Sequence, residues 1–358
     1  MKKNHYHVIG VMSGTSLDGI DLAEIEFSIT DENTSNNTWH FDIRSARTYP
    51  YSLLWKQKLQ QAISYNEEEL TKLDGEYTAY LSEVIIDFIK ENELHQLDAI
   101  CSHGHTILHQ PENGRTLQIG NQKQLSKLIG QKVVCDFRVQ DVALGGQGAP
   151  LVPVGDVLLF SAYDYCLNLG GFANVSKQVD GKRIAYDLCP VNIILNRFAE
   201  KLGKPFDDGG LFAKSGVINL ELLEQLNGLP FYKKSPPKSL GLEWVQRFVF
   251  PLLDATNISA KDMLRTLVEH FAIQIAGEFC EGKSVLITGG GAYNSFLIDR
   301  IRYHKQVNIV IPSNEIIEFK EALIFGLLGV LKLRGEVNCL ASVTGAEMDH
   351  SSGSIFFP

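Results

Sequence analysis

The segment that most constrains the fold is a glycine-containing turn near the N-terminus, Ser13–Asp21, with the sequence SGTSLDGID. An apolar run, Val8–Met12, precedes it, and Ile25, Phe27 and Ile29 follow it in alternation with polar residues. This pattern predicts a buried strand, a tight turn and a half-buried strand. A P-loop places a helix directly after its glycines, so this turn is not a P-loop.

The turn carries more polar groups than an ordinary hairpin needs. Its glycines let the backbone approach a ligand closely, and successive N–H groups in such a turn bind anions. Hydroxyls add donors, and carboxylates suit Mg²⁺, which binds them together with phosphate oxygens. A hairpin without a ligand is the plain alternative. We expect a phosphate site formed by Gly14, Thr15, Ser16, Leu17, Asp18, Gly19, Ile20 and Asp21, with Asp18 as the metal ligand.

Length and composition narrow the class of protein. The 358 residues suffice for two domains, and the net charge of −9 disfavours nucleic acid or an anionic membrane as a partner. The longest apolar stretch, Ala322–Leu331, is shorter than the roughly 20 residues that a membrane span requires. The six cysteines form no CxxC pair and we find no secretory leader, so we expect reduced thiols in a cytoplasmic protein.

A strand that leads into glycines recurs later in the chain. Tyr165–Leu169 leads into Gly170-Gly171, and Ser284–Thr288 leads into Gly289–Gly291 and then a helical pattern. We find no repeat at the level of sequence, so only this local device recurs, once in each half of the chain. Ala143–Pro153 is rich in glycine and proline, which predicts a hinge, an active-site loop or a domain boundary.

One formal P-loop match, GEFCEGKS at Gly277–Ser284, has the wrong surroundings. A P-loop needs a strand before it and a helix after it. Here the helical pattern Glu269–Phe279 comes first and the strand pattern Val285–Thr288 follows. We interpret the match as accidental and Lys283 as a solvated turn residue.

Histidines and a cysteine cluster at Cys101, His103, His105 and His109. Residues two apart on a strand share a face, so the first three could converge on a metal, but the spacing matches no standard zinc site. We favour a polar substrate wall or hydrogen-bonded core histidines.

Three carboxylates stand out by their position. Asp136 and Asp187 each follow a predicted strand, and strand ends are where ligands bind in α/β domains. Glu321 lies at the start of a very apolar predicted helix, Phe319–Leu333. There it either complements the helix dipole or, if it faces a cleft, serves proton transfer.

Taken in order, these segments resemble the anhydro-N-acetylmuramic acid kinases along nearly the whole chain. The resemblance is carried by VIGVMSGTSLDGID at the start, SHGHTILHQP (Ser102–Pro111), TLQIGN (Thr116–Asn121), VVCDFRVQDVALGGQGAPLVP (Val133–Pro153), LNLGGFANVS (Leu167–Ser176), ITGGGAYN (Ile287–Asn294), EALIFGLLG (Glu321–Gly329) and VTGA (Val343–Ala346). It implies the α/β fold shared by acetate and sugar kinases, heat-shock chaperones and actin. That fold has two domains, each with a mixed central sheet, around a nucleotide cleft; here they would contain residues 1–138 with 322–358, and 139–321.

The resemblance also implies an activity, with ATP and Mg²⁺ as cofactors. Water opens the 1,6-anhydro bridge of the amino sugar at C1, and the freed O6 takes the γ-phosphoryl group of ATP. The product is N-acetylmuramic acid 6-phosphate, an intermediate of peptidoglycan recycling. A cytoplasmic homodimer is implied, with no nucleic-acid or membrane partner.

Residue roles follow from the same resemblance. Asp187 matches the base that deprotonates the water, and Glu321 matches a carboxylate that orients it. Further nucleotide contacts are implied for Gly170, Gly171, Asn174, Gly289, Gly290 and Gly291, the last three beside the adenosine. His103, Asp136, Arg138 and Gln147 lie in motifs beside the sugar pocket.

The chain departs from the family pattern at the sugar end. Leu188-Cys189-Pro190-Val191-Asn192 replaces Thr-Gly-Pro-Gly-Asn, His105 stands where glutamine is usual, and Gly241-Leu242-Glu243 lacks an expected arginine. Two alternatives therefore stay open. One is a kinase of the same fold for a different sugar or anhydro-sugar, and the other is a non-enzymatic nucleotide-dependent binding protein.

Overall fold

The computed structural model describes residues 3–30 and 38–358, which fold into two compact units. The first unit contains residues 1–160 and 319–358, and the second contains residues 161–318. Each unit has a mixed β-sheet with helices, which confirms the predicted α/β class with one mixed sheet per domain. Among the residues that the structure describes, no helix is both long and apolar enough to cross a membrane.

The unit boundaries differ from the predicted domain boundaries at residues 138 and 321. The segment 139–160 belongs to the first unit, where its helices α4 (Val139–Ala143) and α5 (Pro153–Leu159) are tied down. Asp141 in α4 accepts a hydrogen bond from Thr344, and Asp156 in α5 forms a 2.7 Å ion pair with Lys320. The glycine- and proline-rich stretch between these helices is therefore a loop inside the first unit.

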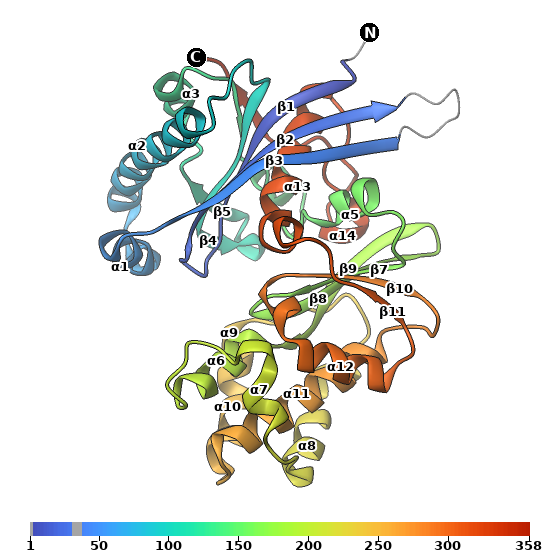
Figure 1. Cartoon of the computed structure of the whole chain (residues 1–358). Helices are drawn as coiled ribbons and strands as arrows, with labels where there is room; N and C mark the ends of the chain where they lie inside the picture. The colour runs from blue at the N-terminus through green and yellow to red at the C-terminus, as the bar shows by residue number, and fades with distance from the viewer. Residues whose placement is uncertain (1–2, 31–37) are drawn as a thin grey trace. The chain divides into compact units, whose positions relative to one another are not determined.

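Among the described residues, the first sheet has seven strands in the order β12-β6-β4-β1-β2-β3, with β5 beside β4. Figure 1 shows β1, β2 and β3 side by side. β1, β2 and β3 form an antiparallel meander, β4 and β6 run parallel to β1, and β12 closes the edge antiparallel to β6. Their bounds are β1 (His5–Ser13), β2 (Gly19–Thr30), β3 (Thr38–Pro50), β4 (Ala99–Gln110), β5 (Arg115–Ile119), β6 (Val133–Cys135) and β12 (Ser354–Phe356).

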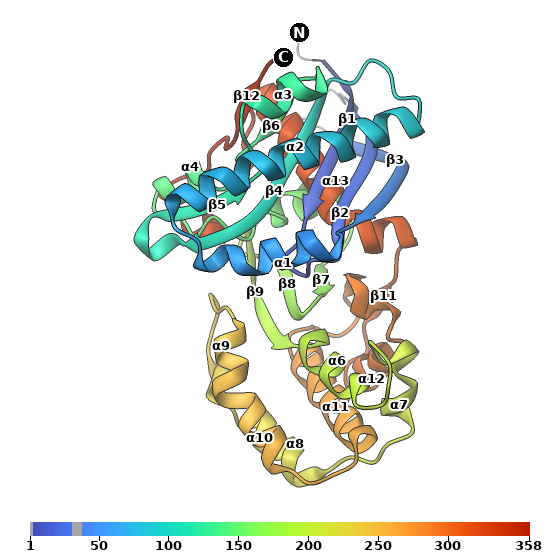
Figure 2. The same cartoon turned by 90° about the vertical axis from the view of Figure 1, so that its left-hand side faces the viewer.

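Helix α2 covers one face of this sheet, with its apolar side buried against β1, β2 and β4 (Figure 2). A capping box starts α2, because the Asn66 side chain accepts from the Glu69 N–H while the Glu69 carboxylate accepts from the Asn66 N–H. Helix α2 is the longest described helix of the unit, and α13 is the next longest. The helix bounds not yet given are α1 (Leu53–Gln61), α2 (Glu67–Glu91), α3 (Gln124–Ile129), α13 (Asn314–Arg334, in this unit from Phe319 on) and α14 (Ala341–Thr344).

Helix α13 packs on the opposite face of the first sheet through small residues. A Cβ on Gly326 would lie 2.8 Å from Ile25 Cδ1, and a Cβ on Gly329 would lie 2.2 Å from Cys101 Sγ. On the strand side, a Cβ on Gly10 would lie 2.0 Å from the carbonyl oxygen of Ala322. Glycine inside a helix costs about 1 kcal/mol relative to alanine. Here it permits the close approach of helix and sheet.

The second sheet has five strands in the order β11-β10-β7-β8-β9. β7, β8 and β9 form an antiparallel meander, and β10 and β11 run parallel to β7. Helix α11, capped by Ser259, buries Leu267, Phe271 and Ile275 in the core of this unit, together with Leu167 and Val285 of the sheet. The strands are β7 (Tyr165–Leu169), β8 (Phe172–Val179), β9 (Lys182–Pro190), β10 (Ser284–Thr288) and β11 (Asn308–Val310); the helices are α6 (Asn192–Glu200), α7 (Leu211–Lys214), α8 (Leu220–Asn227), α9 (Leu242–Trp244), α10 (Phe250–Ala255), α11 (Ala260–Gly277) and α12 (Ser295–His304).

Three local predictions can be scored directly. The strand–turn–strand arrangement around Gly14–Asp18 is confirmed by β1 and β2. The accidental nature of the GEFCEGKS match is also confirmed, because α11 precedes it and β10 follows it, and the exposed Lys283 pairs with Asp164 at 2.9 Å. The start of the last long helix was placed too late. α13 begins at Asn314, so Glu321 lies in its interior and not at its N-terminus.

Candidate functional site

The β1–β2 loop, Gly14–Asp18, leaves several backbone donors free. Its one backbone hydrogen bond inside the loop runs from the Leu17 N–H to the Gly14 carbonyl at 3.3 Å. In the part of the chain that the structure describes, the N–H groups of Thr15 and Ser16 donate to no backbone carbonyl, and both side chains are exposed. Unpaired N–H groups beside hydroxyls are what an anion nest requires. Phosphate binding at this loop stays a prediction.

The metal ligand predicted in this loop is accessible. Asp18 is exposed, and no side chain among residues 3–30 and 38–358 forms a hydrogen bond with its carboxylate. Asp21, on β2, accepts a hydrogen bond from Thr48 Oγ1 at 2.6 Å. One or two carboxylates with water and phosphate oxygens are a usual Mg²⁺ environment, so Asp18 fits this role.

Behind the loop, an uncharged network holds the end of β1. Ser13 Oγ forms hydrogen bonds with His105 Nδ1 at 2.8 Å and with the Tyr51 hydroxyl at 2.6 Å, and Tyr51 reaches Tyr77 at 2.6 Å. Burial lowers the pKa of His105 to about 4 and raises the pKa of Tyr51 to about 12. The histidine that departs from the family pattern is therefore neutral at pH 7 and supports the loop. Sequence reasoning missed the two tyrosines, which no motif singles out.

Arg138 is the centre of the polar groups predicted beside the sugar. Its Nε donates to His103 Nε2 at 2.8 Å, and one terminal nitrogen donates to the Gly148 carbonyl at 2.6 Å. His103 Nδ1 lies 2.9 Å from the Gly104 carbonyl, so both ring nitrogens are used. Burial and the neighbouring Arg138 hold the pKa of His103 well below its usual value. His103 is thus a core histidine whose two ring nitrogens are both hydrogen-bonded, and it orients Arg138. This matches one of the two alternatives left open for the histidines.

The other predicted sugar-side residues lie on the flanking loops. Asp136 follows β6 with a φ of 63°, uncommon for a residue other than glycine, and burial raises its pKa. Gln147 is exposed, and its backbone N–H donates to the Thr344 carbonyl at 2.8 Å. Both side chains are therefore placed for contact with a ligand, and that contact stays a prediction.

A buried carboxylate that sequence reasoning missed, Asp141, organises this region. One of its oxygens accepts from the Gly148 N–H and the other from Thr344 Oγ1, both at 2.7 Å. Because Arg138 donates to the Gly148 carbonyl, Asp141 and Arg138 hold the same residue from both of its peptide groups. Asp141 stands inside one of the resemblance segments and Thr344 inside another, but their contact joins residues 203 apart.

Glu321 lies on α13 among small and apolar residues. Desolvation raises the pKa of its carboxyl; Arg138 opposes the rise and Asp21 adds to it. The side chain is exposed, so solvent limits the size of that rise. The interior position removes the helix-dipole explanation for this residue, and a catalytic role for Glu321 stays a prediction.

In the second unit, four polar residues form a row across the sheet. Thr288 on β10 pairs with Asn168 on β7, Asn168 pairs with Asn174 on β8, and Asn174 pairs with Asp187 on β9. Directly opposite residues place their side chains on the same face. Thr288 Oγ1 is buried and has no hydrogen-bond partner among the described residues. Sequence reasoning selected Asn174 and Asp187 but missed Asn168 and Thr288, although both stand next to the glycine turns.

Asp187 is held by one oxygen and leaves the other without a hydrogen bond from any described residue. The Leu240 N–H donates to Oδ2 at 2.7 Å, and the Asp187 N–H donates to the Lys238 carbonyl at 3.1 Å. Burial raises the pKa of Asp187, and the bond from Leu240 partly offsets this rise. An anchored, partly desolvated carboxylate with a free oxygen is suited to general-base catalysis.

The two glycine turns of the second unit pack against each other. The carbonyls of Gly170 and Gly171 accept from the N–H groups of Asn192 and Val191 at the start of α6, at 3.3 and 2.8 Å. A Cβ on Gly289 would lie 2.5 Å from Asn168 Oδ1, whereas the nearest atom to a Cβ on Gly170 would be Asn168 Nδ2 at 3.3 Å. The Asn168 side chain therefore lies between the two turns.

A pocket of about 260 Å³ adjoins these turns. It is lined by the start of α6, by the segment 206–209 and by the turn 290–294, and it combines apolar side chains such as Leu195 and Phe206 with the polar Asn192 and Asp208. Gly290 and Gly291, predicted to lie beside adenosine, line it, whereas Gly289 does not. Such a mixture of apolar walls and a few polar groups is typical of small-molecule sites.

The residues that depart from the family pattern after Asp187 lie in the core. Leu188, Cys189 and Val191 are each at most 2% exposed and pack in the hydrophobic cluster of the second unit. Their side chains therefore have no surface with which to contact a sugar.

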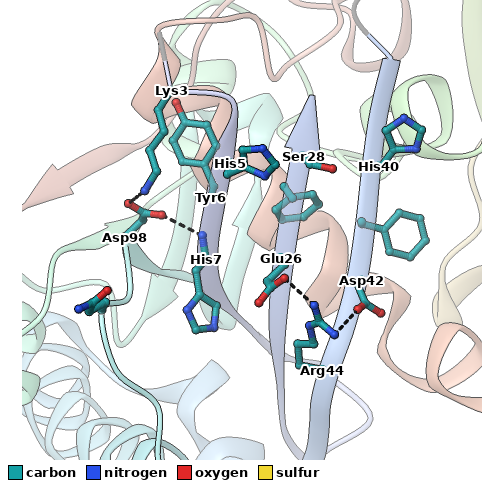
Figure 3. Close-up of a pocket in the computed structure, with 13 residues that line it drawn as sticks. Lys3, His5, Tyr6, His7, Glu26, Ser28, His40, Asp42, Arg44 and Asp98 are labelled. Carbon is teal, nitrogen blue, oxygen red and sulfur yellow. Dashed lines mark hydrogen bonds and ion pairs between the residues drawn. The ribbon is translucent and has the colours of Figure 1, made fainter. Parts of the chain in front are cut away.

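A larger recess of about 510 Å³ in the first unit contains none of the predicted site residues (Figure 3). It lies over the first half of β1, the second half of β2 and the first half of β3, at the opposite end of the strands from the β1–β2 loop. Its charges pair with each other: Arg44 contacts Glu26 at 2.7 Å and Asp42 at 2.8 Å, and Lys3 contacts Asp98 at 2.5 Å. This pairing leaves little charge for a ligand.

Comparison with solved structures gives distant similarity over most of the chain. An activator of the 2-hydroxyisocaproyl-CoA dehydratase from Clostridium difficile with bound ADPNP matches with a TM-score of 0.42 at 11% identity, covering 92% of this chain and 96% of the other. Component A of the (R)-2-hydroxyglutaryl-CoA dehydratase from Acidaminococcus fermentans matches with a TM-score of 0.41 at 12% identity, covering 92% and 99%.

Comparison of sequences gives much closer relatives. The family model described as anhydro-N-acetylmuramic acid kinase matches residues 6–358. Proteins named anhydro-N-acetylmuramic acid kinase from Bacillus thuringiensis subsp. konkukian and Sulfurimonas denitrificans are 34% and 35% identical to this chain. The first match covers 98% of this chain and 99% of its relative, and the second covers 97% and 98%. The chain therefore belongs to the anhydro-N-acetylmuramic acid kinase family.

Proposed function

We propose that this protein is a kinase that opens 1,6-anhydro-N-acetylmuramic acid with water and phosphorylates the freed O6. Water adds to C1, the C1–O6 bond breaks, and O6 forms a bond to the γ-phosphorus of ATP as ADP leaves. The products are N-acetylmuramic acid 6-phosphate and ADP. Family membership over nearly the whole chain supports this activity.

Asp187 is the residue to which we assign the general base. It takes one proton from the attacking water, and the other proton stays on the new C1 hydroxyl. The observation that carries this assignment is its geometry: the Leu240 N–H fixes Oδ2, and the remaining oxygen has no hydrogen bond from the described residues. The raised pKa of Asp187 brings it closer to the operating pH, which favours proton abstraction.

Glu321 is assigned a second role, the orientation of that water. Its pKa is raised by desolvation, and Arg138 and Lys320 provide compensating positive charge. Arg138, Asp136 and Gln147 are proposed to contact the sugar, with His103 and Asp141 as positioning residues. Asp141 and His103 act through Arg138 and Gly148 and need not touch substrate.

ATP is proposed to use both glycine-turn regions. The β1–β2 loop offers N–H and hydroxyl donors to phosphate, and the turn at Gly170-Gly171 with Asn174 offers a second phosphate contact. The pocket beside Gly290 and Gly291 is proposed for the adenosine. Asp18 would hold Mg²⁺, which would neutralise charge on the phosphates. We further propose that the protein acts in the cytoplasm as a homodimer, as the family resemblance implies.

The proposed activity is tested by incubating the protein with ATP, Mg²⁺ and 1,6-anhydro-N-acetylmuramic acid. We expect ADP and a sugar phosphate whose mass exceeds that of the substrate by one phosphoryl group (HPO₃) and one water. In H₂¹⁸O the label should appear at the C1 hydroxyl. No ADP above a control without sugar would reject the proposal. If ADP were released only with another anhydro-sugar, the alternative of a kinase for a different substrate would be favoured.

A further inference from the structure

A buried cluster of three potential metal ligands lies in the first unit and includes Asp141, the positioning residue described above. A carboxylate oxygen of Asp141, the sulfur of Cys339 and a ring nitrogen of His350 all lie within 4.8 Å of one another. The three residues are 0%, 1% and 7% exposed. Side chains of this kind rarely gather in a protein interior without a partner that satisfies them.

The backbone fixes the spacing of two of these ligands. Cys339 and His350 face each other across an isolated antiparallel bridge, with N–H to carbonyl distances of 3.1 and 3.2 Å in the two directions. Directly opposite residues point to the same side of such a pair. The Asn338 amide bonds to the backbone of Ser352 in both directions, at 2.9 and 2.6 Å, and locks this bridge.

The third ligand is oriented from the other side. Asp141 accepts from the Gly148 N–H through one oxygen and from Thr344 Oγ1 through the other. The oxygen bonded to Thr344 also lies 3.6 Å from His350 Nε2. Bonds of this kind commonly orient the ligands of a metal site.

The tautomer of His350 leaves an unexplained atom. Its Nδ1 lies 3.1 Å from the Met348 carbonyl, and a carbonyl can only accept, so Nδ1 carries a proton. Its Nε2 is buried and has no hydrogen-bond partner among the described residues. At 3.6 Å the Asp141 oxygen is too distant for a hydrogen bond. His350 Nε2 therefore lies close to the Asp141 carboxylate and the Cys339 sulfur without a hydrogen bond to either.

We propose that Asp141, Cys339 and His350 form a Zn²⁺ site. Cysteine sulfur, histidine nitrogen and carboxylate oxygen are the donors that Zn²⁺ uses, whereas Mg²⁺ and Ca²⁺ prefer oxygen. A separation of 3.6 Å between Nε2 and the carboxylate oxygen suits an ion about 2.0–2.2 Å from each. Binding releases the thiol proton to solvent, and the carboxylate and thiolate then balance the charge of the ion. The fourth position is left to water.

The ion would join segments that are distant in sequence. Cys339 and His350 belong to the C-terminal segment, and Asp141 belongs to α4, next to the loop that carries Gly148. Zinc would therefore stiffen the loop that receives Arg138. This inference does not depend on the proposed kinase activity, because its test measures bound metal.

The test uses the full-length protein, stripped with EDTA, exchanged into metal-free buffer and titrated with Zn²⁺. We expect one zinc per chain and a higher melting temperature with zinc. Cys339→Ser and His350→Ala should each weaken binding by about 100-fold or more, since loss of an outer-shell partner alone costs about 10–100-fold. Cys280→Ser, which removes an exposed cysteine of the second unit, is the matched control and should bind like wild type.

Co²⁺ substitution gives a readout that does not require a variant to fold. In the wild-type protein we expect tetrahedral d–d bands and a sulfur-to-cobalt charge-transfer band, which Cys339→Ser should lose. The proposal fails if wild-type protein takes up no stoichiometric zinc, or if its cobalt spectrum lacks the sulfur band. It also fails if folded Cys339→Ser and His350→Ala bind zinc as tightly as wild type, because the ion would then lie elsewhere.

Discussion

The two units have the same sheet and use it differently. The order β3-β2-β1-β4-β6 in the first and β9-β8-β7-β10-β11 in the second match in position and direction, each with a meander of three strands and two parallel strands beside its first strand. In the first unit the turn after the first strand keeps free N–H groups. In the second, the carbonyls of the equivalent turn are bonded to the start of α6.

This difference between the two turns indicates which parts of the shared sheet topology can vary in function. The sheet specifies where a turn comes, at the end of the first strand of each meander. Its neighbours then decide whether the turn stays open or becomes part of the packing. The two proposed catalytic carboxylates also differ in where they lie. Glu321 lies on a helix that packs on the first sheet, whereas Asp187 lies on a strand of the second sheet.

The largest effect should separate the two carboxylates. Asp187→Asn removes the proposed base, and we expect kcat to fall by at least about 100-fold, with the KM for ATP nearly unchanged. Glu321→Gln keeps the size and hydrogen-bonding capacity of the side chain, so the loss in kcat should be smaller. Steady-state kinetics of both variants measure this. An equal loss in both, or activity retained in Asp187→Asn, would contradict the assigned roles.

The next effect distinguishes glycines needed for packing from glycines needed by a ligand. A Cβ on Gly291 would lie 2.6 Å from Leu169 Cβ, so Gly291→Ala should destabilise the protein by about 1–3 kcal/mol. The nearest atom to a Cβ on Gly170 or Gly14 would be a side-chain atom, at 3.3 and 3.4 Å, so alanine there should leave the melting temperature nearly unchanged. Both variants should nevertheless raise the KM for ATP.

Denaturant unfolding and ATP kinetics on the three alanine variants provide the check. The comparison breaks if Gly14→Ala or Gly170→Ala binds ATP like wild type, because the turns would then not approach the phosphates. It also breaks if Gly291→Ala is as stable as wild type.

A smaller effect concerns pH and has opposite signs in the two units. The pKa of Asp187 is raised by burial, so the folded state holds its proton more tightly than the unfolded state. Stability therefore falls as pH rises above about 3.8, the usual pKa, and Asp187→Asn should gain relative stability between that pH and neutrality. A hydrogen bond from Arg44 lowers the pKa of Glu26, so Glu26→Gln should instead lose relative stability as pH rises through about 4.5.

Melting temperatures of the two variants and wild type between pH 3 and 7 measure these slopes. The Glu26 slope should be shallow, because its ion pair with Arg44 is solvent-exposed. Two slopes of the same sign would refute the environments described for these carboxyls.

The smallest effect is expected at Lys283. The side chain is exposed and pairs with Asp164 at the turn between α11 and β10. Lys283→Ala should leave the KM for ATP unchanged, because a lysine outside a strand–loop–helix unit has no P-loop geometry. A large rise in that KM would revive the P-loop reading that the surrounding helix and strand exclude.

Much of the local structure could be predicted from the sequence. The alternation of Ile25, Phe27 and Ile29 with polar residues marks β2, and glycines mark the turns at the ends of β1, β7 and β10. These features depend on neighbours within a few residues, which is why a single sequence displays them. The start of α13 was missed although Ile316 and Ile317 extend its apolar residues to within two positions of Asn314.

By itself, then, the sequence determined the class of the fold, the glycine turns and, through resemblance, the family. Tertiary structure alone decided what holds the functional side chains. Ser13 meets His105 across 92 residues, Asp187 is anchored by Leu240 across 53, and Asp141 meets Thr344 across 203. Such contacts form because buried polar groups must find hydrogen-bond partners wherever the packed chain brings them. No local sequence pattern encodes which partners these polar groups find. At Gly14–Asp18, the partners found in the tertiary structure form a buried, uncharged network that supports the loop.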